Sequence, residues 1–332
     1  MKSSFFKRLH RFFDASMTSI KETTMSLISN IKNKVRGFVI ESVRNEFLQL
    51  NEKLSLQNGK MLTNYVNNLT CINTLSDVEF KIFSQWGDDG IIQYLISHLD
   101  IENETFIEFG VSDYQESNTR FLMMNNNWSG LIIDASEDNI KRIKQSDYYW
   151  KYDLEAKAVF IDRENINDLI SSRGFDKNIG LLHIDLDGND YWIWKEINCI
   201  HPIILILEYN SIFGNTAAIT IPYDKSFYRT TAHYSNLYWG ASLRALCLLS
   251  QEKGYTFIGC TSSGNNAYFI RNDKMNSSIH EVSIKEGYVK SKSRESRNTD
   301  YSLSYVTGDD RRIAISGLQV FNIETGVIET LS

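Results

Sequence analysis

Five short apolar segments, separated by segments of helical character, constrain the fold of this 332-residue chain more than any other feature. They are rich in Val, Ile and Leu with few polar interruptions, which indicates strands that are buried on both faces. Alternation of such strands with helices is typical of a parallel sheet covered by helices on both sides. We therefore predict an α/β fold with strands at 105–111, 129–136, 158–162, 179–186 and 202–209.

Two further strands are expected to close this sheet. Residues 240–254 have the pattern of an amphipathic helix, which Gly254 ends. The segments YTFIGCTS (255–262) and NAYFIRND (266–273) then predict a pair of strands joined near Gly264. Residues 274–332 are polar with a few strand-like fragments, and we interpret them as a small C-terminal appendage.

Residues 1–60 differ from the rest of the chain in charge. They hold 11 Lys or Arg and 5 Asp or Glu, which gives +6, and the remainder carries −12. Helical periodicity continues to about residue 57, so we predict a basic, amphipathic helical extension over 1–60. Residues 1–17 gather Phe5, Leu9, Phe12 and Phe13 on one face, which suits a membrane interface, a partner or the chain's own body. The later part of the helix is a candidate segment for homo-oligomerisation.

Composition excludes several classes of protein. An apolar content of 42% with only 2 prolines argues against a disordered chain, and no run of about 18 apolar residues predicts a membrane span. The four cysteines lie far apart, which argues against a disulfide framework or a zinc site. The acidic body disfavours nucleic-acid binding. We expect a cytoplasmic protein, with peripheral contact at the inner face of the membrane through residues 1–17.

Acidic residues stand at the ends of all five predicted parallel strands. In open parallel sheets, ligands bind at these carboxyl ends. Carboxylates that share one rim repel each other unless a cation or hydrogen-bond donors lie between them. A single Asp at such a place is commonly a helix cap, and Asp187-Gly188-Asn189 is also a turn signal. The rim as a whole nevertheless predicts a ligand with hydroxyls and positive charge, together with a metal. These polar positions are Glu108, Asp113, Asp134, Asp162, Asp185, Asp187, Glu208 and Asn210.

The order of these segments resembles that of the FkbM-like group of S-adenosylmethionine-dependent methyltransferases. The resemblance covers residues 80–273 and includes FSQWGDDGII (83–92), FIEFGVSDY (106–114), LLHIDLDGNDYWIW (181–194) and PIILILEYN (202–210). It continues through the helix and strand pair at 238–273. It implies a Rossmann-like domain over 78–273, with a mostly parallel sheet and one closing antiparallel strand.

The resemblance also implies a cofactor site. The turn from Glu108 to Gly110 would hold the methionine part of S-adenosylmethionine, with Gly110 allowing close backbone approach. Asp134 would accept hydrogen bonds from both ribose hydroxyls, and Asp162 would reach the adenine amine. The sequence departs from the family at residues 111–114 (VSDY), where further glycines usually stand. Because of this departure, an enzyme with a degenerate cofactor loop stays an alternative.

The ends of the fourth and fifth strands supply the predicted catalytic groups. Metal-dependent O-methyltransferases of this fold place acidic ligands after the fourth strand and an acid or amide pair after the fifth. Asp185, Glu208 and Asn210 are similar to that arrangement and would hold Mg²⁺. Asp187 would act beside them, and His233, in the long loop after the fifth strand, is the candidate general base.

The resemblance implies methylation of a sugar hydroxyl on a glycan or glycolipid precursor, because members of this group often act on sugars. Two alternatives stay open. Asp185-Leu186-Asp187 is also a DxD motif, as in glycosyltransferases that bind nucleotide sugars through a metal. A non-catalytic module of the same fold, assembled on a membrane through the basic extension, is the second alternative. His183 is the other histidine considered as a base, but its place within an apolar strand is typical of a core histidine.

Overall fold

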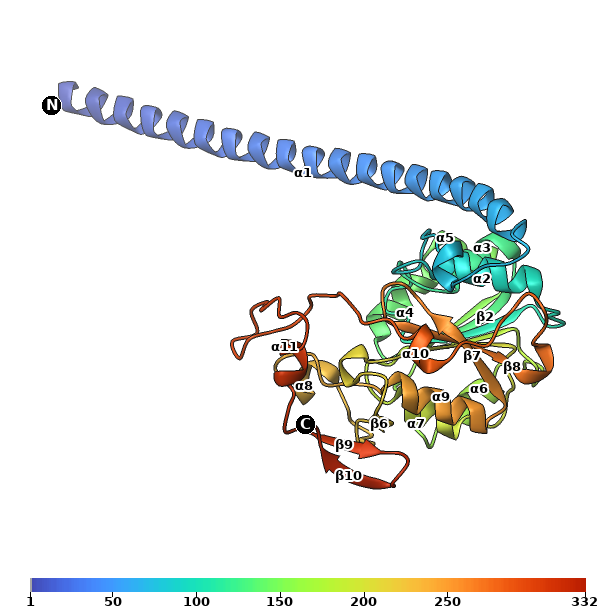
Figure 1. The fold of residues 1–332 in the computed structure, drawn as a ribbon. Coiled ribbons are helices and arrows are strands. Elements are labelled where there is room, and N and C mark those ends of the chain that lie inside the picture. The colour runs from blue at the N-terminus through green and yellow to red at the C-terminus, as the bar shows by residue number, and fades with distance from the viewer. Residues whose placement is uncertain (1) are drawn as a thin grey trace. The chain divides into compact units, whose positions relative to one another are not determined.

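The computed structural model describes residues 2–332, without the side chains of residues 2–24, 26–28 and 45. The chain divides into two compact units, Met1–Gln57 and Asn58–Ser332. Helix α1 (Lys2–Asn67) makes up the first unit and ends within the second (Figure 1). The extension is therefore helical, as expected. The apolar face predicted for residues 1–17 lies outside the described side chains.

Many apolar side chains of α1 are exposed. Val35, Phe38, Val43 and Phe47 each expose more than half of their surface. Apolar side chains in such a row commonly mark a contact surface, so self-association through α1 stays a prediction. Among the helices described, none has the length and apolar content that crossing a membrane requires.

A seven-stranded sheet forms the centre of the second unit, in the order β3-β2-β1-β4-β5-β8-β7. β1 to β5 run parallel, and β8 is antiparallel to both of its neighbours. The predicted α/β sheet with a closing antiparallel strand is confirmed. The order reverses between β1 and β4, which places a crevice beyond their carboxyl ends. The strands are β1 (Thr105–Phe109), β2 (Ser129–Asp134), β3 (Leu154–Ala158), β4 (Leu181–Ile184), β5 (Ile204–Glu208), β7 (Tyr255–Cys260) and β8 (Asn266–Arg271).

The third strand lies earlier in the chain than predicted. We expected it at 158–162, whereas β3 spans Leu154–Ala158. It is an edge strand with alternating burial, and Glu155 and Lys157 point away from the core. Charged residues are common on edge strands because they discourage pairing with other chains. The apolar run 159–161 forms the loop that follows instead.

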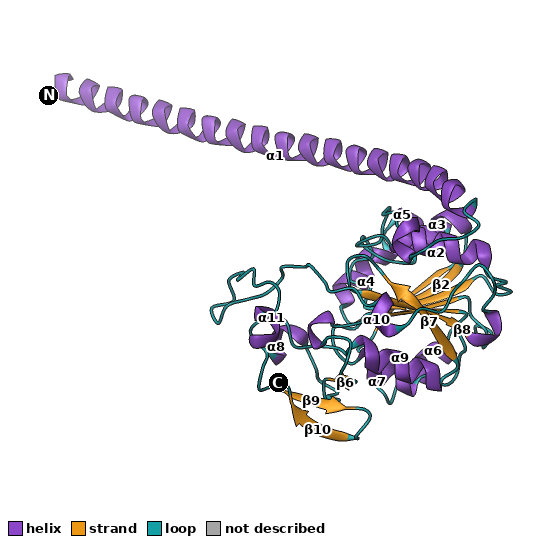
Figure 2. Cartoon of the chain, viewed as in Figure 1, coloured by secondary structure: helices purple, strands orange, loops and turns teal. Residues whose placement is uncertain are grey.

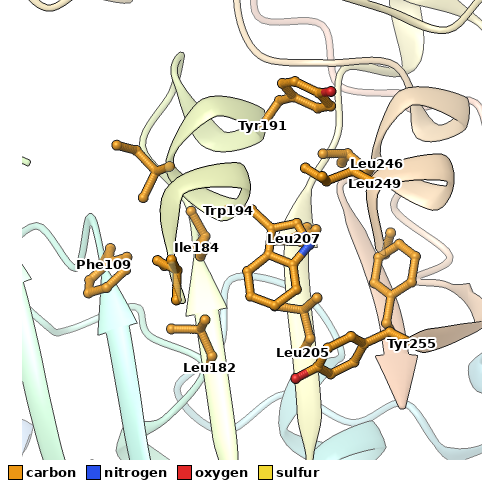
Figure 3. Close-up of a cluster of buried hydrophobic side chains, with 14 of the residues drawn as sticks. Phe109, Leu182, Ile184, Tyr191, Trp194, Leu205, Leu207, Leu246, Leu249 and Tyr255 are labelled. Carbon is orange, nitrogen blue, oxygen red and sulfur yellow. The ribbon is translucent and has the colours of Figure 1, made fainter. Parts of the chain in front are cut away.

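Helices cover both faces of the sheet, and the two sets are distinct in Figure 2. Trp194 of α7 is buried over β4 and β5 beside Leu182, Leu205 and Leu207 (Figure 3). Its indole Nε1 donates to Ser250 Oγ at 3.2 Å, which satisfies its polar atom. One face carries α2 (Asp88–His98), α3 (Arg120–Asn126), α4 (Glu137–Lys144) and α5 (Asp147–Lys151); the other carries α6 (Ile166–Ser171), α7 (Asp190–Glu196) and α9 (Leu243–Glu252).

Residues 274–332, which we interpreted as a small C-terminal appendage, belong to the same compact unit as the sheet. β9 (Gln319–Asn322) pairs with β10 (Val327–Thr330) and with β6 (Ile219–Thr220), which lies between β5 and α9. Ile315 and Leu331 share a buried cluster with Phe213 and Leu237. The C-terminal segment thus packs on the chain that follows β5. The short helical elements are η1 (Leu75–Val78), η2 (Ser211–Phe213), α8 (Arg229–Ala232), η3 (Asn272–Lys274), α10 (Ile284–Gly287) and α11 (Asp310–Ile313).

Gly110 brings the ends of β1 and β4 into close contact. Its φ is +73°, and a Cβ at this position would lie 1.7 Å from the carbonyl oxygen of Asp185. Its N–H donates to the Ile133 carbonyl at 2.9 Å. Both the backbone conformation and the space therefore require glycine.

We predict that Gly110→Ala lowers the free energy of unfolding far more than Gly174→Ala. Gly174 has a φ of +74° and a methyl group added there would have no heavy atom within 4 Å, so it reports the conformational penalty alone. That penalty is about 1 to 2 kcal/mol. In Gly110→Ala the collision of the new methyl group with the Asp185 carbonyl adds to this penalty. Denaturant unfolding of both variants measures the difference in the free energy of unfolding. Equal losses in the two variants would contradict this contact.

Candidate active site

A cavity of about 780 Å³ opens at the carboxyl ends of the parallel strands. This volume lies within the range of about 300–1,000 Å³ that is typical of small-molecule sites. Its walls come from the strand-end loops, from the segment between β6 and α9, and from the C-terminal segment. Residues separated by about 200 positions therefore face one space.

The part of the cavity beyond β1, β2 and β3 combines a carboxylate with an apolar wall. Asp134 Oδ2 accepts a hydrogen bond from Ser112 N at 2.8 Å, and its Oδ1 accepts one from Ser136 N at 2.8 Å. Val159 and Phe160 line the cavity beside it. Asp134 therefore lies in the cavity with a fixed orientation, next to surface that suits a flat aromatic ring.

The glycine-poor loop after β1 keeps a glycine-like backbone. Gly110, Ser112 and Tyr114 have φ values of 73°, 49° and 60°, so alternate residues adopt the left-handed conformation. Tyr114 is fully buried, and its hydroxyl lies 2.9 Å from Thr119 Oγ1. Buried contacts thus stabilise a conformation that is uncommon for residues other than glycine. Within residues 111–114, Ser112 and Tyr114 thus adopt left-handed backbone conformations without the further glycines that the resemblance implies.

Glu108 does not line the cavity. Its carboxylate is buried and accepts hydrogen bonds from Ser117 Oγ at 2.6 Å, Asn118 N at 2.9 Å and Thr119 Oγ1 at 2.5 Å. His183 Nδ1 lies 3.0 Å away. Although burial opposes it, the hydrogen bond with His183 lowers the pKa of Glu108. Glu108 therefore positions the 117–119 loop against β4, and a contact between its turn and the cofactor stays a prediction.

Asp162 is likewise outside the lining of the cavity. Its Oδ2 lies 2.8 Å from Lys225 Nζ, and its Oδ1 accepts hydrogen bonds from Glu164 N and Asn165 N, both at 2.9 Å. Despite partial burial, the hydrogen bond from Lys225 lowers the pKa of Asp162. Asp162 thus organises the turn before α6, and its contact with the adenine amine stays a prediction.

Asp185, Asp190 and Glu208 form an acidic cluster beyond β4 and β5. Each offers one carboxylate oxygen, and these oxygens lie within 4.8 Å of one another. Glu208 Oε2 is buried with no hydrogen-bond partner. Burial and the charge of Asp185 raise the pKa of Glu208 well above its usual value. An oxygen-only set with an unsatisfied buried carboxylate fits a hard divalent cation such as Mg²⁺.

The acidic cluster differs by one residue from the predicted set of metal ligands. Asn210 Nδ2 donates to the carbonyls of Leu237 at 3.0 Å and Trp239 at 2.9 Å, and its Oδ1 accepts from Ile212 N at 3.0 Å. The Asn210 amide therefore connects the turn after β5 to the segment that precedes α9. Asp190, which accepts from Leu186 N at 2.7 Å, takes its place in the cluster. The sequence shows Asp190 only as the first residue of a helix.

The two predicted catalytic residues lie in different surroundings. Asp187 lines the cavity and forms an ion pair with Arg229, which also donates to the Asn236 carbonyl at 3.0 Å. His233 is not a lining residue, and its Nδ1 lies 2.7 Å from Ser235 Oγ. Burial lowers the pKa of His233. Asp187 thus lines the candidate site. His233 lies outside the cavity lining, and its role as general base stays a prediction.

The C-terminal segment contributes residues that sequence reasoning missed. Ser291, Ser293, Glu295 and Arg311 line the cavity. Glu295 lies 3.7 Å from Arg229, so it adds to the charge network around Asp187. No periodic pattern in residues 274–332 indicates this role, because contacts with the segment after β5 create it.

Comparison with known proteins gives a distant likeness to solved structures and no relative in sequence. No protein-family model matches the sequence, and no curated protein matches it. Similar solved structures include the N-terminal domain of EvdMO1 with S-adenosylhomocysteine bound (TM-score 0.32, 10% identity, 50% of this chain and 72% of that chain). They also include PKMT2 from Rickettsia typhi with the same compound (0.34, 13%, 53% and 51%) and an O-methyltransferase family protein from Burkholderia thailandensis (0.34, 10%, 73% and 59%). The alignments span little more than half of the latter two proteins.

We predict that, without divalent cations, the free energy of unfolding falls as pH rises from 5 to 8. Burial and the charge of Asp187 raise the pKa of Asp185 to about 6, and burial and Asp185 raise that of Asp190 to about 7. The folded state therefore holds more protons than the unfolded state above pH 4, and it loses this advantage as these groups ionise.

Glu208→Gln removes one charge of the cluster and should make this fall with pH shallower. The measurement is denaturant unfolding at several pH values in the presence of a chelator. Glu104→Gln, at an exposed position, is the control and should leave the dependence unchanged. An unchanged dependence in Glu208→Gln would show that the three carboxylates do not interact.

Proposed function

We propose that this protein is an S-adenosylmethionine-dependent methyltransferase that methylates a hydroxyl group, with a sugar hydroxyl as the acceptor. The observation that supports this proposal most is that one cavity is bordered by residues suited to bind the methyl donor and by residues suited to bind the acceptor. Gly110 and Asp134 border it at the ends of β1 and β2, and Asp185 and Glu208 border it at the ends of β4 and β5. Methyl transfer depends on holding donor and acceptor in line, which one shared cavity permits.

The donor would bind beyond β1, β2 and β3. In this proposal the Asp134 carboxylate accepts hydrogen bonds from the ribose hydroxyls, and Val159 and Phe160 contact the adenine ring. The absence of a side chain at Gly110 leaves the backbone open to the methionine part. The nearby carboxylates of Asp185 and Glu208 favour a ligand with positive charge, which the sulfonium group carries.

The acceptor would bind beyond β4 and β5. Asp185, Asp190 and Glu208 would hold Mg²⁺ there, and a bound cation would lower the pKa of an acceptor hydroxyl and orient it. In this proposal Asp187, which lines the cavity outside the cluster, receives the hydroxyl proton. The aromatic side chain of Phe227 lines this part of the cavity and offers a flat surface for a sugar ring.

The two alternatives have less support. The glycosyltransferase alternative would use Asp185 and Asp187 together, but Asp187 is ion-paired with Arg229 and only Asp185 belongs to the acidic cluster. A non-catalytic module would tolerate a filled crevice, whereas here the cavity is open and the loop from Gly110 to Tyr114 keeps its glycine-like path. Neither observation favours a nucleotide sugar or a purely structural role.

We predict that S-adenosylhomocysteine binds the wild-type protein and that Asp134→Asn weakens binding about 10- to 100-fold. The reason is the loss of hydrogen bonds to a charged acceptor, which contribute about 1.5–3 kcal/mol. Isothermal titration calorimetry provides the dissociation constants. Asp138→Asn, an exposed substitution of the same kind on α4, is the matched control. Binding of UDP-sugars instead of S-adenosylhomocysteine would reject the proposal in favour of the glycosyltransferase.

We also predict that Glu208→Gln abolishes Mn²⁺ binding while changing the affinity for S-adenosylhomocysteine less than twofold. The substitution preserves shape but removes a charged ligand from the acceptor side only. Electron paramagnetic resonance of Mn²⁺ measures metal occupancy, and calorimetry measures the cofactor product. Asp187→Ala should retain Mn²⁺, because its carboxylate lies outside the cluster, and should lose methyl transfer. Equal Mn²⁺ binding by wild type and Glu208→Gln would exclude this metal site.

A further inference from the structure

Arg311 presents a buried positive charge to the cavity without a carboxylate partner. The residue lies on α11, is 8% exposed and lines the cavity. Its Nη1 donates to the Ser291 carbonyl at 3.0 Å, and its Nε is buried with no hydrogen-bond partner. Within the described part of the chain, no acidic side chain lies close enough to form an ion pair with it.

Arg229, the other arginine of the cavity, is fully engaged by comparison. It pairs with Asp187, lies 3.7 Å from Glu295 and stacks 4.7 Å above the centre of the Trp239 ring. Arg229 therefore has carboxylates within ion-pair distance, whereas Arg311 has only the more distant charge of Glu295. A guanidinium group keeps its charge at any physiological pH, and burial of an unpaired charge is costly. This combination is what a site for an anionic ligand requires.

The fold places Arg311 far from the nucleoside side of the cavity. The neighbouring Arg312 donates to the Ile212 carbonyl at 3.2 Å, and Ser291 N donates to Ser211 Oγ at 3.0 Å, so this segment is fixed beyond β5. Asp134 ends β2, which is three strands away in the sheet. With strands about 4.8 Å apart, that separation is roughly 14 Å. A negative group at Arg311 therefore belongs to the acceptor side.

We propose that Arg311, together with the hydroxyl groups of Ser291 and Ser293, binds an anionic group of the methyl acceptor, either a carboxylate or a phosphate. The inference rests on the proposed function and narrows the acceptor class to acidic sugars, such as uronic acids or sugar phosphates. The planar fork of the guanidinium matches the oxygens of both groups. Neutral sugars would leave Arg311 without a partner.

The test uses the full-length protein saturated with S-adenosylhomocysteine and two simple probes, inorganic phosphate and acetate. Thermal unfolding is followed as each probe is added, with chloride at equal ionic strength as the reference. We expect at least one probe to stabilise the wild type beyond chloride, with at least a tenfold weaker apparent affinity in Arg311→Gln. A stronger effect of phosphate indicates a phosphorylated acceptor, and a stronger effect of acetate indicates a carboxylate.

Arg311→Lys, which keeps the charge, should retain part of the effect and replaces Arg311→Gln if that variant does not fold. Arg244→Gln removes a surface ion pair with Glu324 and should behave as wild type. Stabilisation that is equal to chloride, or unchanged in Arg311→Gln, would overturn the inference. A tenfold loss of S-adenosylhomocysteine affinity in Arg311→Gln would also overturn it, because Arg311 would then hold the cofactor's own carboxylate. If the wild type does not bind S-adenosylhomocysteine, the proposed function itself fails, and titration of the unliganded protein still reports on Arg311.

Discussion

The contact between Gly110 and the carbonyl oxygen of Asp185 is the constraint on which the candidate site depends. It joins the ends of β1 and β4, the two strands at which the strand order reverses. Because no Cβ fits between them, the loop after β1 can approach the loop after β4. The buried network around Glu108 and His183 fixes the same two strands from within the sheet. Groups from both halves of the sheet can therefore border one cavity.

The sequence allows most of the fold to be predicted, because burial on both faces of a parallel strand leaves a continuous apolar run. That signal fails at the edge, where β3 alternates and contains Glu155 and Lys157. It also fails for residues 274–332, whose strands are short and whose contacts are with the segment after β5. The local hydrophobic pattern indicates helices and strands well. It does not indicate which distant segment of the chain packs against them.

The candidate site is predictable only in part, for the same physical reason. Strand-end positions are readable from the sequence, and Gly110, Asp134, Asp185 and Glu208 do border one space. The contacts of each side chain depend on the tertiary structure. The Asn210 amide donates to backbone carbonyls, whereas the Asp190 carboxylate lies near that of Glu208. No pattern in the sequence around Arg311 indicates that it lines the cavity.

Two halves of opposite character thus face each other across the cavity, an Asp134 side with an apolar wall and an acidic side that ends at Arg311. The most direct test of the account is a crystal structure of the protein with S-adenosylhomocysteine and Mn²⁺. The account predicts adenosine between Asp134 and Phe160, with an anomalous manganese peak among Asp185, Asp190 and Glu208. A cofactor product bound elsewhere, or a cavity that excludes it, would contradict the central claim.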